Sequence, residues 1–374
     1  MLPFPILNNY GNTAPKVKNI KDVQCGVSSV SILYDNGQLY AKGSYTGNGA
    51  VTSTEWSLIP GNHDKIICSA AGTVSIHTDG SIWYAGSTGK AFNINSSVLT
   101  FTEVTSTFGV HANNIKKISL GRNSVLFLTN DNDLYGMGYN STGELGSSVI
   151  NSFRGPVLIS SSVKDMYLYS EASGYITTSG TFYRCGLNGT YSNLGTGTTT
   201  NVTSFTPYAI GSHVIDCIMN STNTYLLVDN NGVLEIHSCG AGSFGALGND
   251  GVSTSTKNTL SSINFKYSSS LTKESMKIRG MPSIWNLYLI GKNNAQLFTC
   301  GYNASYQLGV GTTNPKTILN SSSIGLPEVN LLDGYFLMLN NANMFIYEKK
   351  IYAAGVHNTF GISSNTFTFL SNVP

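Results

Sequence analysis

Charged residues are scarce in this sequence. Asp, Glu, Lys and Arg make up 11% of the 374 residues, and the formal net charge is +2, whereas globular domains average about a quarter charged residues. Nucleic acids and anionic membranes attract proteins through clustered Lys and Arg, and the short basic groups here are isolated from one another. The sequence therefore predicts a surface of Ser, Thr, Asn, Tyr and Gly, with neither nucleic acid nor membrane as a partner.

Long apolar runs are also missing. Residues 1–7 have neither the basic start nor the long apolar stretch of a secretory signal. No run approaches the roughly 20 apolar residues that cross a bilayer. We expect no membrane insertion. If the protein acts outside a cell, we expect it to leave the cell as part of an assembly, by lysis or by an unusual route.

The usual signatures of catalysis and metal binding are absent as well. No Cys-x-x-Cys pair, Cys/His zinc spacing, nucleophile elbow, P-loop or dinucleotide fingerprint occurs. Asp131, Asn132 and Asp133 begin like a calcium loop, but its twelfth position is Thr142 rather than an acid. The sequence predicts no enzyme activity, no metal and no cofactor.

The sequence instead contains one short pattern in several imperfect copies. These are residues 138–146 (GYNSTGELG), 186–195 with one residue inserted (GLNGTYSNLG), 240–248 (GAGSFGALG) and 301–309 (GYNASYQLG). Each copy follows an apolar strand, a turn of Asp, Asn or Gly in most units, and a second strand that ends at the first glycine of the copy. Asp-Gly and Asn-Gly between apolar runs favour β-hairpins, because they supply the positive φ of a primed turn.

Similar hairpins recur along the whole chain, each preceded by a further apolar strand. Their end glycines are 43 to 61 residues apart, at Gly43, Gly86, Gly138, Gly186, Gly240, Gly301 and Gly355. Such spacing is typical of four-stranded propeller blades. We predict an all-β fold, a seven-bladed β-propeller of four-stranded blades in residues 19–374. Residues 1–18 are expected to form an N-terminal arm that packs on or closes the last blade around Thr366–Leu370.

The order of these features resembles the regulator of chromosome condensation repeat. It consists of a strand, an Asp-Gly turn, a second strand that ends in Gly, and then the pattern G-x-N-x-x-x-Q/E-L-G. Residues 138–146 and 301–309 match best, and no clear copy follows Gly43, Gly86 or Gly355. The resemblance implies a seven-bladed propeller. Family members include a nucleotide exchange factor on chromatin, an ultraviolet photoreceptor and an inhibitor of β-lactamase. None of these activities carries over, since the chain has no basic tail and only three tryptophans.

We predict structural roles for the glycines and leucines of the four copies. Glycine at a strand end permits positive φ or a close backbone approach, and the leucine is expected to fill the space between adjacent blades. This set is Gly138, Leu145, Gly146, Gly186, Leu194, Gly195, Gly240, Leu247, Gly248, Gly301, Leu308 and Gly309. Cys185, Cys239 and Cys300 directly precede three of the end glycines, a placement that favours small buried core residues.

Aromatic residues in the loops after the end glycines are the candidate binding residues. These loops gather on one side of a propeller, and Tyr with Asn, Ser and Gly is typical of adaptable protein or glycan recognition. The alternative is that each ring packs between blades. The candidates are Tyr139, Tyr191, Phe244, Tyr302 and Tyr306.

The sequence thus predicts a non-catalytic β-propeller that binds other proteins. The low charge and polar surface favour a structural component of an assembled particle, such as a bacteriophage virion (tail, collar or capsid decoration), with neighbouring subunits as partners. The second hypothesis is an intracellular, cytoplasmic regulator that binds a GTPase or another protein. The third is a glycan-binding or hydrolytic propeller on a receptor-binding particle, with cell-surface glycan as its ligand.

Overall fold

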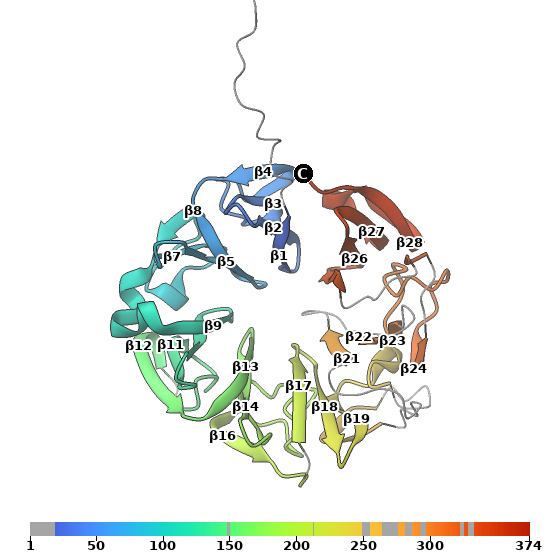
Figure 1. Ribbon diagram of the computed structural model, residues 1–374. Helices are drawn as coiled ribbons and strands as arrows, with labels where there is room; N and C mark the ends of the chain where they lie inside the picture. The colour runs from blue at the N-terminus through green and yellow to red at the C-terminus, as the bar shows by residue number, and fades with distance from the viewer. Residues whose placement is uncertain are drawn as a thin grey trace, which may run out of the picture.

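The strands form four-stranded antiparallel sheets arranged in a ring (Figure 1). This computed structural model describes residues 19–147, 150–211, 213–248, 255–263, 276–280, 286–291, 297–321, 325–327 and 333–374. Each sheet is one blade, numbered in chain order, and its strands A to D run from the centre of the ring outward (Figure 1). The prediction of an all-β propeller with four-stranded blades is confirmed.

Consecutive segments of the chain supply the blades. Blade 1 contains β1 (Ile20–Cys25), β2 (Ser29–Tyr34), β3 (Leu39–Ser44) and β4 (Thr52–Ile59), and blade 2 contains β5 (His63–Cys68), β6 (Gly72–His77), β7 (Ile82–Gly86) and β8 (Val98–Glu103). Blade 3 contains β9 (Ile115–Leu120), β10 (Ser124–Thr129), β11 (Leu134–Asn140) and β12 (Ile150–Ser160). Blade 4 contains β13 (Val163–Tyr169), β14 (Ala172–Thr177), β15 (Phe182–Gly186) and β16 (Val202–Tyr208).

The second half of the chain continues this order. Blade 5 contains β17 (His213–Met219), β18 (Asn223–Asn230), β19 (Val233–Gly240) and β20 (Lys257–Ser262). Blade 6 contains β21 (Met276–Gly280), β22 (Asn286–Gly291), β23 (Leu297–Gly301) and β24 (Lys316–Ser321). Blade 7 contains β25 (Tyr335–Leu339), β26 (Ala342–Tyr347), β27 (Lys350–His357) and β28 (Ile362–Asn372).

The predicted Asp-Gly and Asn-Gly pairs form tight turns between strands B and C. Gly37 has a φ of 80° and Gly80 a φ of 84°, and the N–H of Gly80 donates to the carbonyl of His77 at 2.9 Å. Glycine adopts this left-handed conformation without steric cost. These turns therefore fix the hairpins on which the repeat is built.

The hydrophobic core lies between neighbouring blades. Every residue of β2 and β10 is buried, because the middle strands have a blade on each side, whereas the outer strand β16 is largely exposed. The core clusters span the boundaries, as where Val74 and Tyr84 of blade 2 join Val125 and Phe127 of blade 3. Burial on both faces explains why the strand B segments read as continuous apolar runs.

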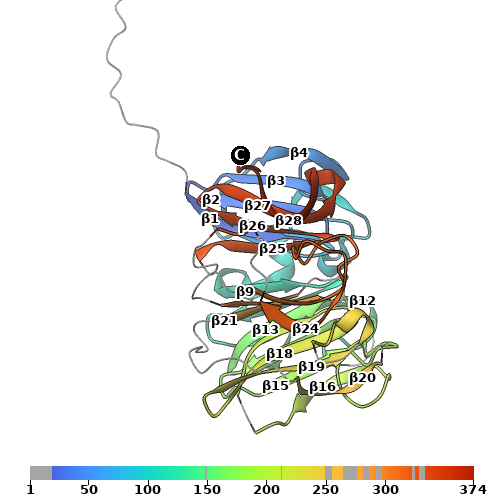
Figure 2. The same cartoon turned by 90° about the vertical axis from the view of Figure 1, so that its right-hand side faces the viewer.

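The first and last blades close the ring (Figures 1 and 2). Val30 and Ile32 of blade 1 share a buried cluster with Leu339 of blade 7. The Tyr34 hydroxyl donates to the carbonyl of Pro374, and β28 supplies the outer strand of blade 7. Residues 1–18 lie outside the described residues, so the predicted contact of the N-terminal arm with this blade stays a prediction.

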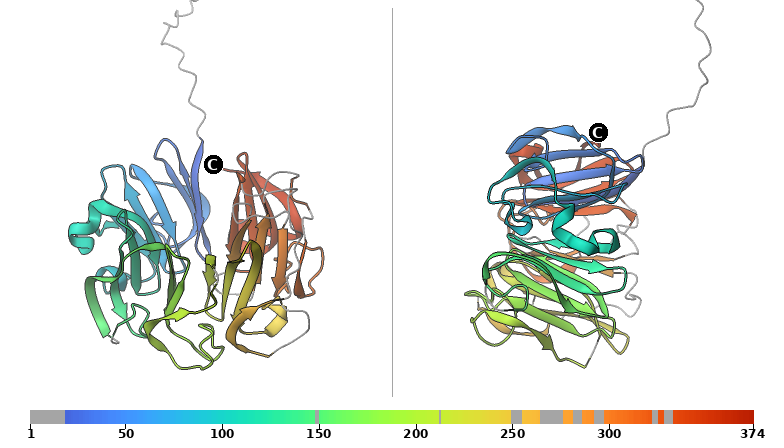
Figure 3. Two further views of the ribbon diagram at one scale, coloured as in Figure 1. Left: turned by 60° about the horizontal axis from the view of Figure 1, so that its bottom comes forward. Right: turned by 90° about the vertical axis from the view of Figure 1, so that its left-hand side faces the viewer.

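Short 3-10 helices occupy some connections. They are η1 (Lys90–Phe92), η2 (Thr105–Asn114), η3 (Ser243–Gly245) and η6 (Asn358–Phe360). The η2 segment lies on the outer side of the ring (Figure 3), with Phe108 buried against blades 2 and 3. In the part of the chain that the structure describes, no helix has the length and apolar character needed to cross a membrane.

Candidate protein-interaction face

The A–B turns and the C–D loops share one face of the ring, which we call the motif face. Strands alternate in direction within an antiparallel sheet, so the first and third connections lie at the same end. The four motif copies are the C–D loops of blades 3, 4, 5 and 6. The sequence-predicted residues are therefore gathered on the motif face.

An asparagine at the third motif position holds three of these loops in shape. Asn140, Asn188 and Asn303 are buried, and the side-chain oxygen of each accepts the N–H of the motif leucine at 2.8–2.9 Å. Nδ2 of Asn303 also donates to the carbonyl of Thr312 at 2.6 Å. Each amide thus satisfies loop backbone groups that burial would otherwise leave unpaired. Structural roles were predicted for the glycines and leucines of the motif but not for this asparagine.

The loop is also fixed to the next blade through the residue before the leucine. The carbonyl of Asn193 accepts hydrogen bonds from Thr224 Oγ1 at 2.5 Å and from Cys239 Sγ at 3.3 Å, and Cys185 makes the same contact with Glu144 at 3.4 Å. This contact explains why cysteine recurs directly before the end glycine. Burial raises the pKa of Cys239 to about 12, so the thiol stays protonated. The cysteines predicted to be buried, Cys185, Cys239 and Cys300, are fully buried and form no disulfide.

The motif leucines and glycines lie at the boundaries between blades. Leu145 packs with Tyr175 of blade 4, and Leu308 packs with Phe367 of blade 7. At Gly186, with a φ of +101°, a Cβ would come within 2.3 Å of a backbone oxygen in the A–B turn. All four leucines, Leu145, Leu194, Leu247 and Leu308, are buried, and Gly138, Gly146, Gly186, Gly195, Gly240, Gly248, Gly301 and Gly309 all have positive φ.

The candidate binding aromatics are spread over several loops of the motif face. Phe244 and Tyr302, from blades 5 and 6, meet edge to face with 4.9 Å between their ring centroids, while Phe244 remains 39% exposed. Tyr139 of blade 3 lies under Nζ of Lys90 from the preceding blade, 5.4 Å from the ring centroid. The remaining two, Tyr191 and Tyr306, are half-buried. The rings therefore combine packing between loops with partial exposure, and they do not form one compact patch.

Charge is distributed unequally between the two faces. Within the described ranges, the A–B turns and C–D loops carry only Lys90, Arg122, Glu144 and Glu171. The opposite face carries charges at the first residues of the inner strands and in the B–C turns, at Lys21, Asp22, Asp35, Asp64, Lys65, Asp79, Lys116, Lys117, Asp131, Asp133, Lys164, Asp165, Asp216, Glu348 and Lys349. The loops and turns of the motif face are thus polar and nearly uncharged, while Arg154 and Lys257 on strand D lie beside the end glycines at this end of blades 3 and 5.

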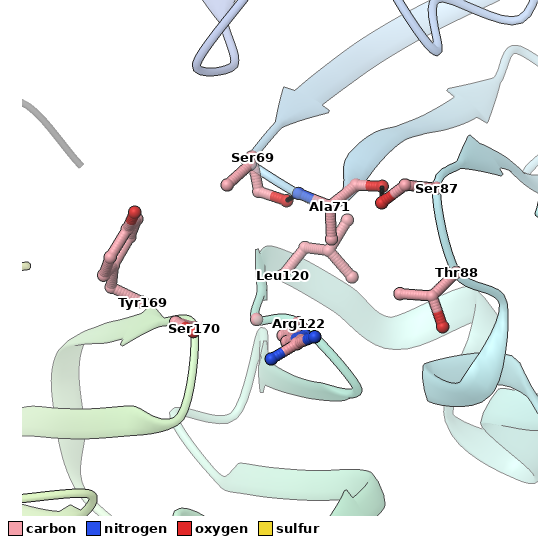
Figure 4. Close-up of a pocket in the computed structure, with 10 residues that line it drawn as sticks. Ser69, Ala71, Ser87, Thr88, Leu120, Arg122, Tyr169 and Ser170 are labelled. Carbon is pink, nitrogen blue, oxygen red and sulfur yellow. Dashed lines mark hydrogen bonds between the residues drawn. The ribbon is translucent and has the colours of Figure 1, made fainter. Parts of the chain in front are cut away.

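A cavity of about 490 Å³ opens between the A–B turns of blades 2, 3 and 4 on the motif face (Figure 4). Ser69 and Ala71 come from the first turn, Arg122 from the second, and Tyr169 and Ser170 from the third. Because three blades contribute residues to the cavity, no contiguous stretch of the sequence indicates it. The cavity was therefore not predicted from the sequence.

Arg122 is the charged residue of the cavity lining. Its side chain is 66% exposed, and Nη1 lies 3.8 Å from a carboxylate oxygen of Glu171. Its backbone N–H donates to the carbonyl of Ser170 at 3.0 Å, which joins the turns of blades 3 and 4. Burial raises the pKa of Tyr169, so its hydroxyl is neutral at pH 7. A guanidinium among hydroxyls suits the binding of a polar or anionic group, and the lining pairs no nucleophile with a base.

One chain of titratable groups resembles an acid–base relay. Nε2 of His237 lies 2.8 Å from Oε2 of Glu235, and its Nδ1 lies 3.0 Å from the hydroxyl of Tyr208. Tyr208 also donates to the carbonyl of Leu260 at 3.1 Å, and burial raises its pKa to about 12. A hydroxyl this difficult to ionise joins blades 4 and 5 as a structural link. Among the residues that can be described, no group of three or more His, Cys, Asp or Glu side chains could hold a metal ion.

Residues 115–144 match the family model described as the regulator of chromosome condensation (RCC1) repeat. This segment of the chain is similar to an RCC1 repeat. The matched segment contains strands A, B and C of blade 3 and most of its motif loop. The predicted resemblance to the RCC1 repeat family is therefore confirmed.

Several solved structures share the fold of this chain. Yeast RCC1 (Prp20), solved bound to Kap60, has a TM-score of 0.67 at 12% identity, covering 91% of this chain and 81% of that one. Prp20p from Saccharomyces cerevisiae, described with its binding properties to Gsp1p and histones, has a TM-score of 0.66 at 12% identity, covering 94% and 82%. Human WBSCR16 has a TM-score of 0.66 at 14% identity, covering 86% and 85%. At these identities the likeness is one of fold, and no curated protein matches the chain.

Proposed function

We propose that this protein is a non-catalytic interaction module whose motif face binds another protein. The observation that carries the proposal is the make-up of this face, which presents exposed or half-buried aromatic rings with Ser, Asn and Gly, and which also contains the Arg122 cavity. Aromatic and small polar side chains give a large contact area at low entropic cost. The Arg122 cavity opens between the turns of this face, which favours the motif face as the binding surface.

The proposed partner is a regulatory protein inside a cell, such as a GTPase. The fold shared with yeast RCC1, and with a Prp20p described with its binding to Gsp1p and histones, supports this hypothesis. The comparisons give no support to a virion component or to a glycan receptor. The regulator is therefore the preferred proposal, ahead of the assembled particle that composition alone favoured.

Cross-linking of the tagged chain in its native source tests the proposal, followed by affinity purification, sedimentation and mass spectrometry. We expect a small complex of fixed stoichiometry, with cross-links at Lys90 on the motif face and few at Lys116 or Lys164 on the opposite face. Co-sedimentation with a large particle would support the virion component instead. Recovery of the chain alone would contradict a protein-binding role.

A further inference from the structure

The C–D loop of blade 1 keeps a contact that the sequence pattern does not show there. A Cβ added to Gly47 would lie 2.5 Å from the ring of Phe101 in blade 2. A Cβ added to Gly146, the last glycine of the blade 3 motif, would lie 2.3 Å from the ring of Phe205 in blade 4. Both phenylalanines belong to strand D of the following blade. Gly47 is therefore the structural equivalent of Gly146.

Two large residues of the boundary between blades 3 and 4 have small counterparts between blades 1 and 2. Thr46 precedes Gly47 and so takes the place of Leu145. Ser75 takes the place of Tyr175. Ser75 pairs with Trp83, three residues before Gly86, and Tyr175 pairs with Tyr183, three residues before Gly186. Thr46 is buried, and its hydroxyl has no hydrogen-bond partner within the described part of the chain. A position that leucine fills elsewhere is thus occupied by a smaller, poorly satisfied side chain.

A larger cavity lies at the same boundary, and Gly47 and Phe101 line it whereas Thr46 and Ser75 do not. The space at the boundary of blades 1 and 2 has a volume of about 690 Å³, against about 300 Å³ at the boundary of blades 3 and 4. Its lining carries no charge and includes Leu58, Ile59, Pro60, Trp83 and Phe101. Volume and composition both lie in the range of ligand-binding cavities, which are mainly apolar with few polar groups.

The rim and wall of this cavity present groups suited to an apolar side chain. Leu58 is 52% exposed at the rim. His77 stacks on Trp83 with 5.2 Å between ring centroids and an interplanar angle of 13°. Nε2 of His77 is buried and has no hydrogen-bond partner among the residues described. The wall thus combines flat aromatic surface with one unsatisfied polar atom.

We propose that the cavity between blades 1 and 2 binds a leucine or aromatic side chain presented by a protein partner. The proposal rests on the proposed function and names one feature of the partner. The chain itself indicates the occupant, because Leu145 and Leu308 enter the corresponding boundaries of blades 3/4 and 6/7. The uncharged lining disfavours an acidic or basic side chain, which would lose its hydration on entry.

Titration with blocked amino acids tests the site without a known partner. N-acetyl-leucinamide and N-acetyl-phenylalaninamide are added to the full chain, and the indole N–H signal of Trp83 is followed by NMR, with N-acetyl-glutaminamide as the polar control. We expect saturable shifts with the two apolar amides only. Thr46→Leu introduces the residue that, as Leu145, lines the smaller cavity of blades 3 and 4, so it should narrow the site and weaken binding at least tenfold. Thr199→Leu, the same change at an exposed loop position, should not. Leu58→Asp at the exposed rim gives a second loss variant with little risk to folding.

Several outcomes would overturn the inference. These are no saturable shift in the folded wild-type protein, equal shifts with the polar control, or undiminished binding in both Thr46→Leu and Leu58→Asp. A partner recovered by cross-linking that binds both variants as tightly as wild type also refutes it, and leaves the protein-binding function standing. If no partner is recovered, the proposed function fails on its own test, while the titration still decides whether the cavity accepts apolar side chains.

Discussion

At the scale of single residues, the same motif position holds a charged and a neutral side chain in different repeats. Glu144 and Gln307 both precede the motif leucine, and both are fully buried. Oε2 of Glu144 accepts the backbone N–H and the hydroxyl of Thr142 at 3.0 and 2.9 Å, and Oε1 of Gln307 accepts the N–H of Ser305 at 2.9 Å. Both side chains therefore accept hydrogen bonds from their own loop, but only Glu144 can carry a charge, which is unfavourable when buried.

Glu144→Gln should stabilise the protein at neutral pH. Burial raises the pKa of Glu144, so the folded state takes up its proton more readily than the unfolded state does. The carboxylate therefore lowers stability at pH 7, and this cost falls as pH drops through the raised pKa. We expect a gain of roughly 1 kcal/mol in the free energy of unfolding at pH 7, with a smaller gain at pH 4.5. Urea denaturation at both pH values measures it, and a loss at pH 7 would contradict it.

His63 should make stability depend on pH below neutrality. Its Nδ1 lies 2.7 Å from Ser75 Oγ, and burial, with help from His77, lowers its pKa from 6.5 to about 4. Since the folded pKa is depressed, the unfolded state binds more protons between pH 4 and 6.5, and stability falls as pH falls through that window. His63→Gln should reduce the loss of unfolding free energy between pH 7 and 5. Equal losses in the variant and the wild type would count against this explanation.

At the scale of structural elements, the C–D loop is the unit that joins each blade to the next. Asp-Gly turns and end glycines identify the hairpins from sequence, because few residues other than glycine adopt positive φ. The loop of blade 1 was not recognised, because Thr46 replaces the leucine and the loop is shorter. Only the contact between Gly47 and Phe101 shows that it serves the same purpose. A loop can be recognised from the sequence when its characteristic side chains are present. It cannot be recognised when only its backbone conformation is kept and the side chains differ.

Gly186→Ala should destabilise the protein strongly. The substitution forces a side chain into a positive φ and brings its Cβ within 2.3 Å of a backbone oxygen that cannot move aside easily. We expect a loss of roughly 2–4 kcal/mol in the free energy of unfolding. Gly155→Ala is the matched control, because an added Cβ there meets nothing within 4 Å. Equal effects of the two substitutions in urea denaturation would refute the proposed role of the end glycine.

At the scale of the whole molecule, the ring places loops with few charges on one face and charged strand starts on the other. Some of those charges join neighbouring blades, as Nζ of Lys21 does with the Asp64 carboxylate at 2.6 Å. The four-stranded blades follow from the repeat and were predicted. The Arg122 cavity was not, because its residues come from three separate blades and meet only in the closed ring. The predicted loop aromatics lie on the same face but remain candidates for binding.

The most direct test of the account measures the affinity of the recovered partner for variants of the two faces. Phe244→Asn and Arg122→Gln alter the motif face; asparagine tolerates the positive φ of Phe244, so the loop should keep its shape. Lys164→Gln is the control on the opposite face. We expect at least a tenfold loss of affinity in calorimetric titration for one or both motif-face variants, and less than a twofold change for the control. Full affinity in both motif-face variants together with a loss in Lys164→Gln would contradict it and place the binding surface on the charged face.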